Sequence, residues 1–207
     1  YEDTFLTLPS VNKLDEETAK ILGTRRGYLR LWGLKSLTPE VAAALVAHNG
    51  QRLGLSGVEE ISPEVARELV NGKRNGGIVL GLAALPADLA EILADFPYYL
   101  DFPKLETLSL ESARAIKEHG VAVKVGAETR GPPLHLGKAK ISPEVAEELL
   151  WHEGPLGLMG VKRLEPGVGD ILARHKFEVR LLLEELDSVA LARKLFSESN
   201  AASSVNN

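Results

Sequence analysis

One short phrase constrains the fold of this chain more than any other feature. The segment Ile61–Leu69, with the sequence ISPEVAREL, recurs with small changes along almost the whole length. Ser62 can cap a helix, Pro63 suits the first helical position because no N–H is needed there, and Glu64 favours the positive end of the helix dipole. The apolar residues that follow fall on one helical face. The phrase therefore predicts the start of a short amphipathic helix.

Each copy of this phrase follows a short segment in which apolar residues alternate, as expected for a β-strand. The first apolar residue of these segments recurs at steps of 22 to 25 residues, with one longer step of 34: Leu6, Leu29, Leu53, Ile78, Leu100, Leu134, Leu156 and Val179. Such a step predicts repeats that each supply one strand and one helix. Because no unit can bury its apolar face alone, the units must stack, with parallel strands on one face and short helices on the other.

The repeats also define the domain organisation. Residues 1–196 are expected to form a single α/β solenoid of about seven to eight repeats. The long step contains an irregular insertion at 121–133. Residues 177–196 are less regular and are expected to form a C-terminal cap with a more polar outer face. Residues 197–207 are rich in Ser and Asn without apolar periodicity, which predicts a disordered tail or linker.

Strand leucines spaced as L-x-L, followed by a helix, resemble a leucine-rich-repeat solenoid. Phrases such as Leu37–Ala42 and Ile141–Ala146 look like those of a divergent bacterial class of leucine-rich-repeat-like proteins. The resemblance covers about residues 5–196 and implies a fold but no particular ligand. One feature differs, because apolar residues replace the asparagine with which the family satisfies its turns: Val11, Leu34, Val58, Leu82, Leu105 and Val161. The turn backbone must therefore be satisfied in another way.

Composition excludes several classes of function. The net charge is −5 without a basic block, which disfavours binding to nucleic acid. The absence of Cys excludes disulfides, thiolate zinc sites and a cysteine nucleophile. The most apolar stretch, Ile78–Leu93, is interrupted by glycine, proline and acidic residues, so no membrane insertion is predicted. The chain begins with Tyr1 and not Met, which suggests a processed or excised segment. We expect a monomer or part of a longer chain. The sequence leaves the compartment open.

Two columns of equivalent residues could carry chemistry. Four histidines lie three residues after the last apolar residue of a predicted helix: His48, His119, His152 and His175. Neighbours in a stack lie about 5 Å apart, close enough to share a metal ion. A histidine at this position also interacts with the carbonyl end of the helix and packs against the next unit, and we favour this structural role.

The second column is acidic and lies in the first helical turn, where a carboxylate stabilises the helix without further purpose: Glu17, Glu40, Glu64, Asp88, Glu111 and Glu144. No G-x-S-x-G, H-E-x-x-H or P-loop motif occurs. We therefore predict no enzyme, no cofactor and no metal site.

Residues that alternate with the strand leucines must point outward from the sheet. The predicted partner-binding residues on this strand face are Tyr28, Arg30, Trp32, Arg52, Tyr99, Asp101, Lys104 and His135. Aromatic residues and arginine are enriched at interface cores, and Trp32 is the best single candidate. The alternative is that Trp32 and Tyr28 cover the N-terminal end of the core. Glycines such as Gly54 and Gly157 at outward positions argue for a flat face with few anchors.

These observations favour a non-catalytic protein–protein interaction module that binds a protein partner through the strand face. The alternative is a structural spacer or scaffold domain of a larger, surface-associated protein. An enzyme is a third hypothesis, which would require a deep pocket that gathers His135, Arg130 and Glu128 from the insertion.

Overall fold

A computed structural model shows one strand and one helix for each repeat. The structure describes residues 5–47, 50, 52–72, 76–119, 124–125, 128–129 and 131–204. The repeat strands are β1 (Phe5–Thr7), β2 (Tyr28–Arg30), β3 (Arg52–Leu55), β4 (Gly77–Leu80), β5 (Leu100–Asp101), β8 (Leu134–His135), β9 (Leu156–Leu158) and β10 (Val179–Leu181). The helices are α1 (Glu16–Gly23), α2 (Pro39–Val46), α3 (Pro63–Asn71), α4 (Ala87–Ala94), α5 (Leu110–Ile116), α6 (Pro143–Leu149), α7 (Val168–Leu172) and α8 (Val189–Ser204).

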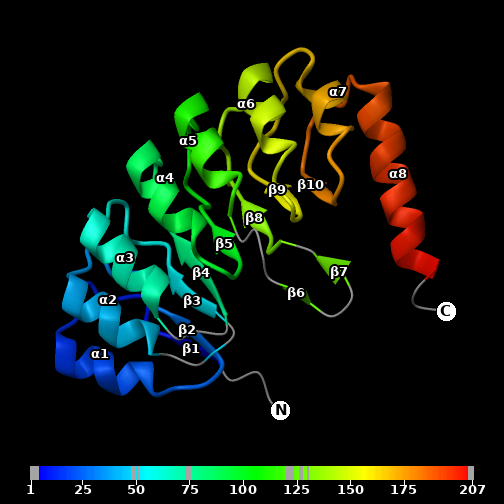
Figure 1. Ribbon diagram of the computed structural model, residues 1–207. Helices are drawn as coiled ribbons and strands as arrows, with labels where there is room; N and C mark the ends of the chain where they lie inside the picture. The colour runs from blue at the N-terminus through cyan, green and yellow to red at the C-terminus, as the bar shows by residue number, and fades with distance from the viewer. Residues whose placement is uncertain are drawn as a thin grey trace.

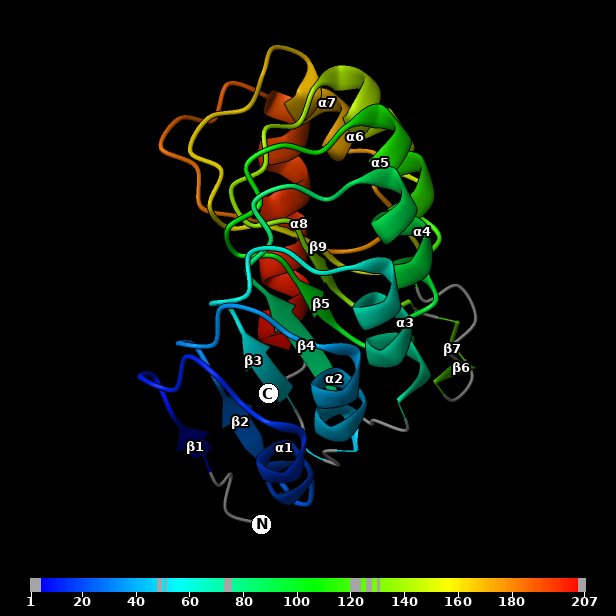
Figure 2. The same cartoon turned by 90° about the vertical axis from the view of Figure 1, so that its left-hand side faces the viewer.

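The eight repeat strands form one parallel sheet in the order β1-β2-β3-β4-β5-β8-β9-β10 (Figure 1). Equivalent repeat positions lie opposite each other, so that Leu29 pairs with Leu6 on one neighbour and Leu53 on the other. Helices α1 to α7 stack along one side of this sheet (Figure 2). The stack curves, with the helices outside and the strands inside. The predicted α/β solenoid, with strands on one face and helices on the other, is confirmed.

The core lies between the sheet and the helices. Strand leucines at equivalent positions form continuous buried columns, and Leu29, Leu31, Leu53 and Leu55 are fully buried. Burial of each such side chain contributes about 1.5–3 kcal/mol. Because every column is shared between units, the repeats stabilise one another.

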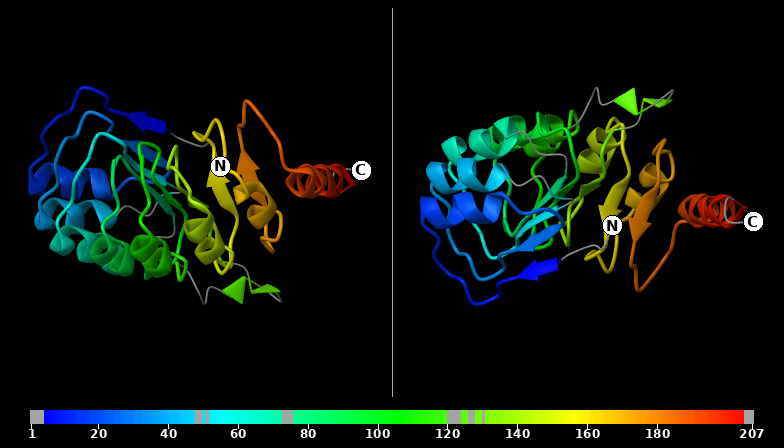
Figure 3. Two further views of the ribbon diagram at one scale, coloured as in Figure 1. Left: turned by 90° about the horizontal axis from the view of Figure 1, so that it is seen from above. Right: turned by 90° about the horizontal axis from the view of Figure 1, so that it is seen from below.

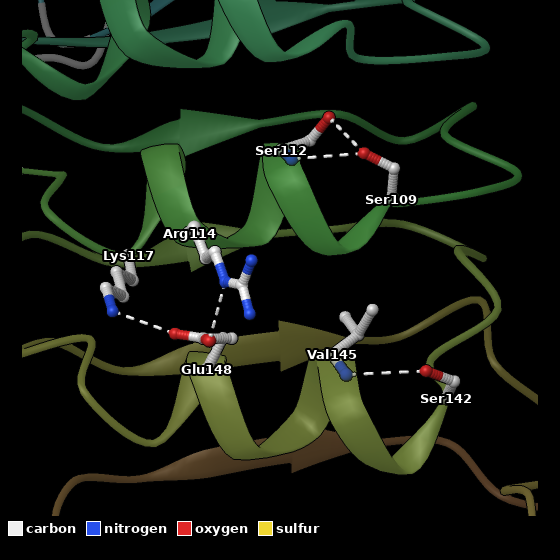
Figure 4. A network of polar contacts seen from close by, with 7 residues as sticks. All are labelled: Ser109, Ser112, Arg114, Lys117, Ser142, Val145 and Glu148. Atoms are coloured by element: carbon white, nitrogen blue, oxygen red, sulfur yellow. Dashed lines mark hydrogen bonds and ion pairs between the residues drawn. The ribbon is translucent and has the colours of Figure 1, made fainter.

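Side-chain caps start the helices as the phrase predicts. The side chains of five residues accept a hydrogen bond from the backbone N–H three residues later: Asp15, Thr38, Ser62, Ser109 and Ser142 (the last two in Figure 4). The carboxylates of Glu40, Glu64 and Glu111 accept hydrogen bonds from their backbone N–H groups and, with a smaller effect, from the hydroxyl of the capping residue. These hydrogen bonds lower the pKa of each carboxyl group. The acidic column therefore has a local role in helix initiation.

Polar contacts also join neighbouring helices. Glu148 on α6 accepts from Arg114 Nε at 2.9 Å and from Lys117 Nζ at 2.8 Å, both from α5 or its end (Figure 4). The buried Ser112 donates its hydroxyl proton to the carbonyl of Leu85, one unit earlier, at 2.6 Å. These contacts fix the spacing of the units on the helical side.

The turns after the strands are satisfied without asparagine. The backbone N–H of Val58 donates to the carbonyl of Leu55 at 3.0 Å, and equivalent bonds occur at Leu34, Leu105 and Val161. The apolar side chains at these positions are buried and extend the core. A local backbone turn thus replaces the side-chain ladder of the family that the sequence resembles.

The insertion expected at 121–133 adds no strand to the parallel sheet among its described residues. Strand β5 pairs directly with β8, with Leu100 opposite Leu134. Within the insertion, β6 (Lys124–Val125) and β7 (Glu128–Thr129) pair antiparallel as a hairpin beside the stack (Figure 3). The sheet is therefore continuous across the long step.

The C-terminal helix extends further than expected. Helix α8 continues to Ser204, whereas the sequence predicted a disordered tail or linker from Ser197. Residues 197–204 contain no glycine or proline that would end a helix. Leu191 of this helix is fully buried. The exposed apolar side chains at this end are Leu182, Leu186, Val189 and Phe196.

Candidate functional site

The register of the sheet brings outward-facing residues of different repeats into two columns. Tyr28 lies opposite Arg52, and Arg30 lies opposite Gly54. Further along, Asp101 lies opposite Val79 on one side and His135 on the other. Seven of the eight predicted partner-binding residues belong to this strand face, although they come from four different repeats.

An aromatic cluster with one arginine occupies the N-terminal part of the strand face. The rings of Phe5 and Tyr28 stack with centroids 4.7 Å apart. The guanidinium carbon of Arg30 lies 4.7 Å from the Phe5 ring centroid and 5.4 Å from that of Trp32. Trp32 remains 45% exposed, beside the backbone of Gly54. Trp32 therefore lies on the strand face beside Arg30, and almost half of its surface is open to a partner.

A chain of hydrogen bonds crosses the middle of the face. The hydroxyl of Tyr99 donates to Asp101 Oδ2 at 2.8 Å, and Tyr99 Oη lies 2.8 Å from His135 Nδ1. Because the phenol has only one proton and a carboxylate only accepts, His135 must donate from Nδ1 to Tyr99. His135 Nε2 is then unprotonated, and it is buried without a hydrogen-bond partner.

Two glycines allow this chain to lie flat on the sheet. A Cβ atom at Gly77 would lie 2.5 Å from a ring carbon of Tyr99, and one at Gly157 would lie 2.3 Å from a ring carbon of His135. Neither contact is possible, so only glycine permits the rings to cover these strands. The outward glycines, which the sequence suggested would leave few anchors, instead support the side chains of neighbouring repeats.

Arginine side chains flank the chain. The guanidinium carbon of Arg52 lies 4.4 Å from the Tyr99 ring centroid, and Arg180 forms a bidentate pair with Glu178. Burial, together with the charge of Asp101, raises the pKa of Tyr99 above its usual value. Burial, together with the nearby guanidinium groups, lowers the pKa of His135. At neutral pH both groups are therefore uncharged.

Between the aromatic cluster and the hydrogen-bond chain lies a hollow of about 300 Å³, which we call the strand-face hollow. Over β3 and β4 the lining side chains are short, namely those of Gly54, Ser56 and Val79. The neighbouring strands on either side carry longer side chains. Its lining residues are Tyr28, Leu29, Arg30, Trp32, Arg52, Gly54, Ser56, Val79, Asp101 and Pro103. Five predicted partner-binding residues line it: Tyr28, Arg30, Trp32, Arg52 and Asp101.

Lys104 does not join this group. It follows β5 and extends to Glu59, with Nζ 2.7 Å from Oε1, in an exposed ion pair between two loops. Arg180, which alternation also places outward, belongs to this surface. Phe5 is a member that the prediction did not include. It occupies the same outward repeat position as Tyr28, so comparison of repeat positions could have identified it.

The histidine column lies away from this face, at the ends of the helices. His119, His152 and His175 are almost fully buried. The His119 and His152 rings stack with centroids 5.8 Å apart, and His119 Nε2 donates to the carbonyl of Tyr98 at 2.9 Å. Phe96 occupies the equivalent position one unit earlier and is also buried, which indicates a packing position. His48 lies outside the described residues.

Among the described residues, no group of three or more His, Asp or Glu is arranged to hold a metal ion. None of the described helices is long and apolar enough to cross a membrane. The enzyme hypothesis requires a deep pocket that includes Arg130, and this residue lies outside the described residues.

No protein-family model matches the chain, and no curated protein matches it significantly.

Proposed function

We propose that this protein is a leucine-rich-repeat-like solenoid that acts as a non-catalytic protein–protein interaction module and binds through its strand face. The observation that carries this proposal is Trp32, which is 45% exposed beside Arg30 at the rim of the strand-face hollow. Trp, Tyr and Arg are the residues that most often dominate the binding energy of interfaces.

The surface is also ordered before any partner arrives. Ring contacts hold Arg30 against Phe5 and Trp32, and hydrogen bonds hold Tyr99 between Asp101 and His135. An interface whose side chains are already immobilised loses less conformational entropy on binding. The same contacts therefore favour recognition of a partner by a preformed surface.

The hydrogen-bond chain is the arrangement most similar to a catalytic site, and its chemistry favours a structural role. The raised pKa of Tyr99 disfavours a phenolate nucleophile. His135 Nε2, the nitrogen free to act as a base, has no accessible surface because it lies against Gly157. A substrate could not reach it without displacement of the ring.

A pull-down tests the proposal. The bait proteins are the intact chain, a Tyr28→Ala/Arg30→Ala/Trp32→Ala variant, and Trp151→Ala as the matched control. Trp151 is the second tryptophan, is 73% exposed and follows α6, several repeats from the hollow. The intact chain and the control should retain a protein partner that the triple variant loses. A partner retained equally by all three would exclude this face.

A scaffold role within a larger protein is the second candidate, and the apolar C-terminal end favours it. Leu182, Leu186, Val189 and Phe196, all within the last repeat and α8, are each 46% exposed or more. A neighbouring domain or subunit that covers them would explain their exposure. A Leu182→Ser/Phe196→Ser variant should then lose self-association or domain docking in sedimentation velocity, while partner binding at Trp32 is retained.

A further inference from the structure

Two guanidinium groups at the strand-face hollow form no ion pair with an acid among the described residues. Arg30 and Arg52 make no hydrogen bond or ion pair with the described part of the chain. Each instead lies over aromatic rings, Arg30 over Phe5 and Trp32, and Arg52 over Tyr99. A guanidinium stacked through its face keeps its N–H groups available at the edge, in the geometry that matches a carboxylate. Ring contacts therefore hold both side chains, while neither guanidinium donates a hydrogen bond to the described residues.

Several other cationic side chains of the surface pair with glutamates. Lys104, Lys138 and Arg163 pair with glutamates of neighbouring segments, and Arg180 pairs with Glu178, two residues earlier. The protein carries a net charge of −5, so acidic residues are not scarce. Among the described residues that line the hollow, the two arginines outnumber the one acid, which leaves a local positive site on an acidic protein. The acid that lines the hollow, Asp101, already accepts a hydrogen bond from Tyr99.

The hollow itself suits an apolar side chain. Gly54, Ser56 and Val79, from β3, the residue after it and β4, line the hollow between Trp32, which follows β2, and Pro103, which follows β5. Its volume of about 300 Å³ is at the lower end of the range for ligand pockets, which suits one large side chain of a peptide segment. An occupant that fills this space brings its neighbouring residues toward the two arginines.

We propose that the strand-face hollow binds an acidic segment of a protein partner, with one bulky apolar side chain in the hollow and Asp or Glu carboxylates on Arg30 and Arg52. This inference rests on the proposed function and adds the chemistry of the partner. Charge complementarity favours an acidic segment, because its carboxylates can form ion pairs with the two guanidinium groups, whereas a basic segment is repelled. In an extended segment, residues two apart lie about 6–7 Å from each other on one face, so acids can flank the apolar residue.

Selection from a random, unphosphorylated peptide library on the intact chain tests the inference. The enriched peptides should carry Asp or Glu beside Leu, Phe or Trp. For one synthetic peptide from this set, fluorescence anisotropy should show that Arg30→Gln and Arg52→Gln each weaken binding about tenfold, the effect of a lost charge-assisted hydrogen bond. Arg163→Gln, at an exposed ion pair far from the hollow, is the matched control and should leave the affinity unchanged.

The outcomes separate this inference from the proposed function. If peptide binding requires Trp32 but is unaffected by Arg30→Gln and Arg52→Gln, the acidic segment is wrong and the strand-face interaction stands. If no peptide binds in a Trp32-dependent manner, both are wrong. Enrichment of basic peptides, or competition by heparin without any binding of acidic peptides, would also overturn the inference. Circular dichroism of each variant establishes that the comparison is between folded proteins.

Discussion

Acidification from pH 7 to pH 5 should destabilise this protein through its buried histidines. Burial and the neighbouring imidazole lower the pKa of His119 to about 3, and burial together with His175 lowers that of His152 to about 4. In the unfolded chain both return to an ordinary pKa of about 6.5. Below that pH the unfolded state binds more protons than the folded state. The contribution of the two histidines to the free energy of unfolding is therefore fully present above the pKa of the unfolded chain. It is lost as the pH falls toward their pKa values in the folded protein.

The magnitude follows from these pKa values. At pH 5 each histidine is almost fully protonated in the unfolded chain and almost fully neutral in the folded one. Relative to pH 7, this difference costs about 2 kcal/mol for each residue and about 4 kcal/mol for the pair. A domain with a free energy of unfolding of about 5–15 kcal/mol loses a large fraction of it.

Urea unfolding followed by circular dichroism at pH 7 and pH 5 measures the effect. The informative variant is His119→Phe/His152→Phe, because Phe96 shows that this repeat position accepts a phenylalanine with 1% exposure. Over the same interval the double variant should lose about 4 kcal/mol less than the original protein. A smaller loss remains, because burial also lowers the pKa of His135, whereas paired carboxylates titrate mainly below pH 5. An unchanged midpoint in the original protein, or the full loss in the double variant, would refute the assignment to these histidines.

Five further substitutions test other parts of the structure, with unfolding in urea as the measurement for the first four. Trp32→Ala should cost less than about 1 kcal/mol because the side chain is half exposed, whereas Leu31→Ala should cost about 2–5 kcal/mol. Ser112→Ala should cost about 1–3 kcal/mol, since a buried carbonyl loses its donor. Glu148→Gln should cost about 1 kcal/mol, and less at high salt. Gly157→Ala should displace the imidazole that it supports, which NMR chemical shifts of that ring would report.

The fold was largely predictable because its determinants are local. The cap at Ser62, the proline after it and the following glutamate act within one helical turn, and the structure shows the cap as expected. The steps between first strand residues give the register directly, since parallel strands align equivalent positions. The extension of α8 was missed because the composition after Ser197 suggests disorder, although nothing there stops a helix.

The candidate site was predictable only as a set of outward positions. Alternation identified Trp32 and Arg52 as outward, but it could not show which residues meet. Lys104 illustrates the limit: it follows a strand at an outward position, yet its flexible side chain extends to Glu59 in a loop of an earlier unit. The path of a long side chain depends on partners that are distant in sequence.

By itself, the sequence determined the repeat, its strands and helices, their parallel stacking and the buried leucine columns, because periodicity and helix caps act over a few residues. Only the tertiary structure decided which outward residues cooperate. The hollow exists because small residues of β3 and β4 lie between longer side chains of their neighbours. The chain from Tyr99 to His135 exists because glycines lie beneath both rings. These arrangements depend on side chains from repeats more than twenty residues apart, which become neighbours only when the units stack.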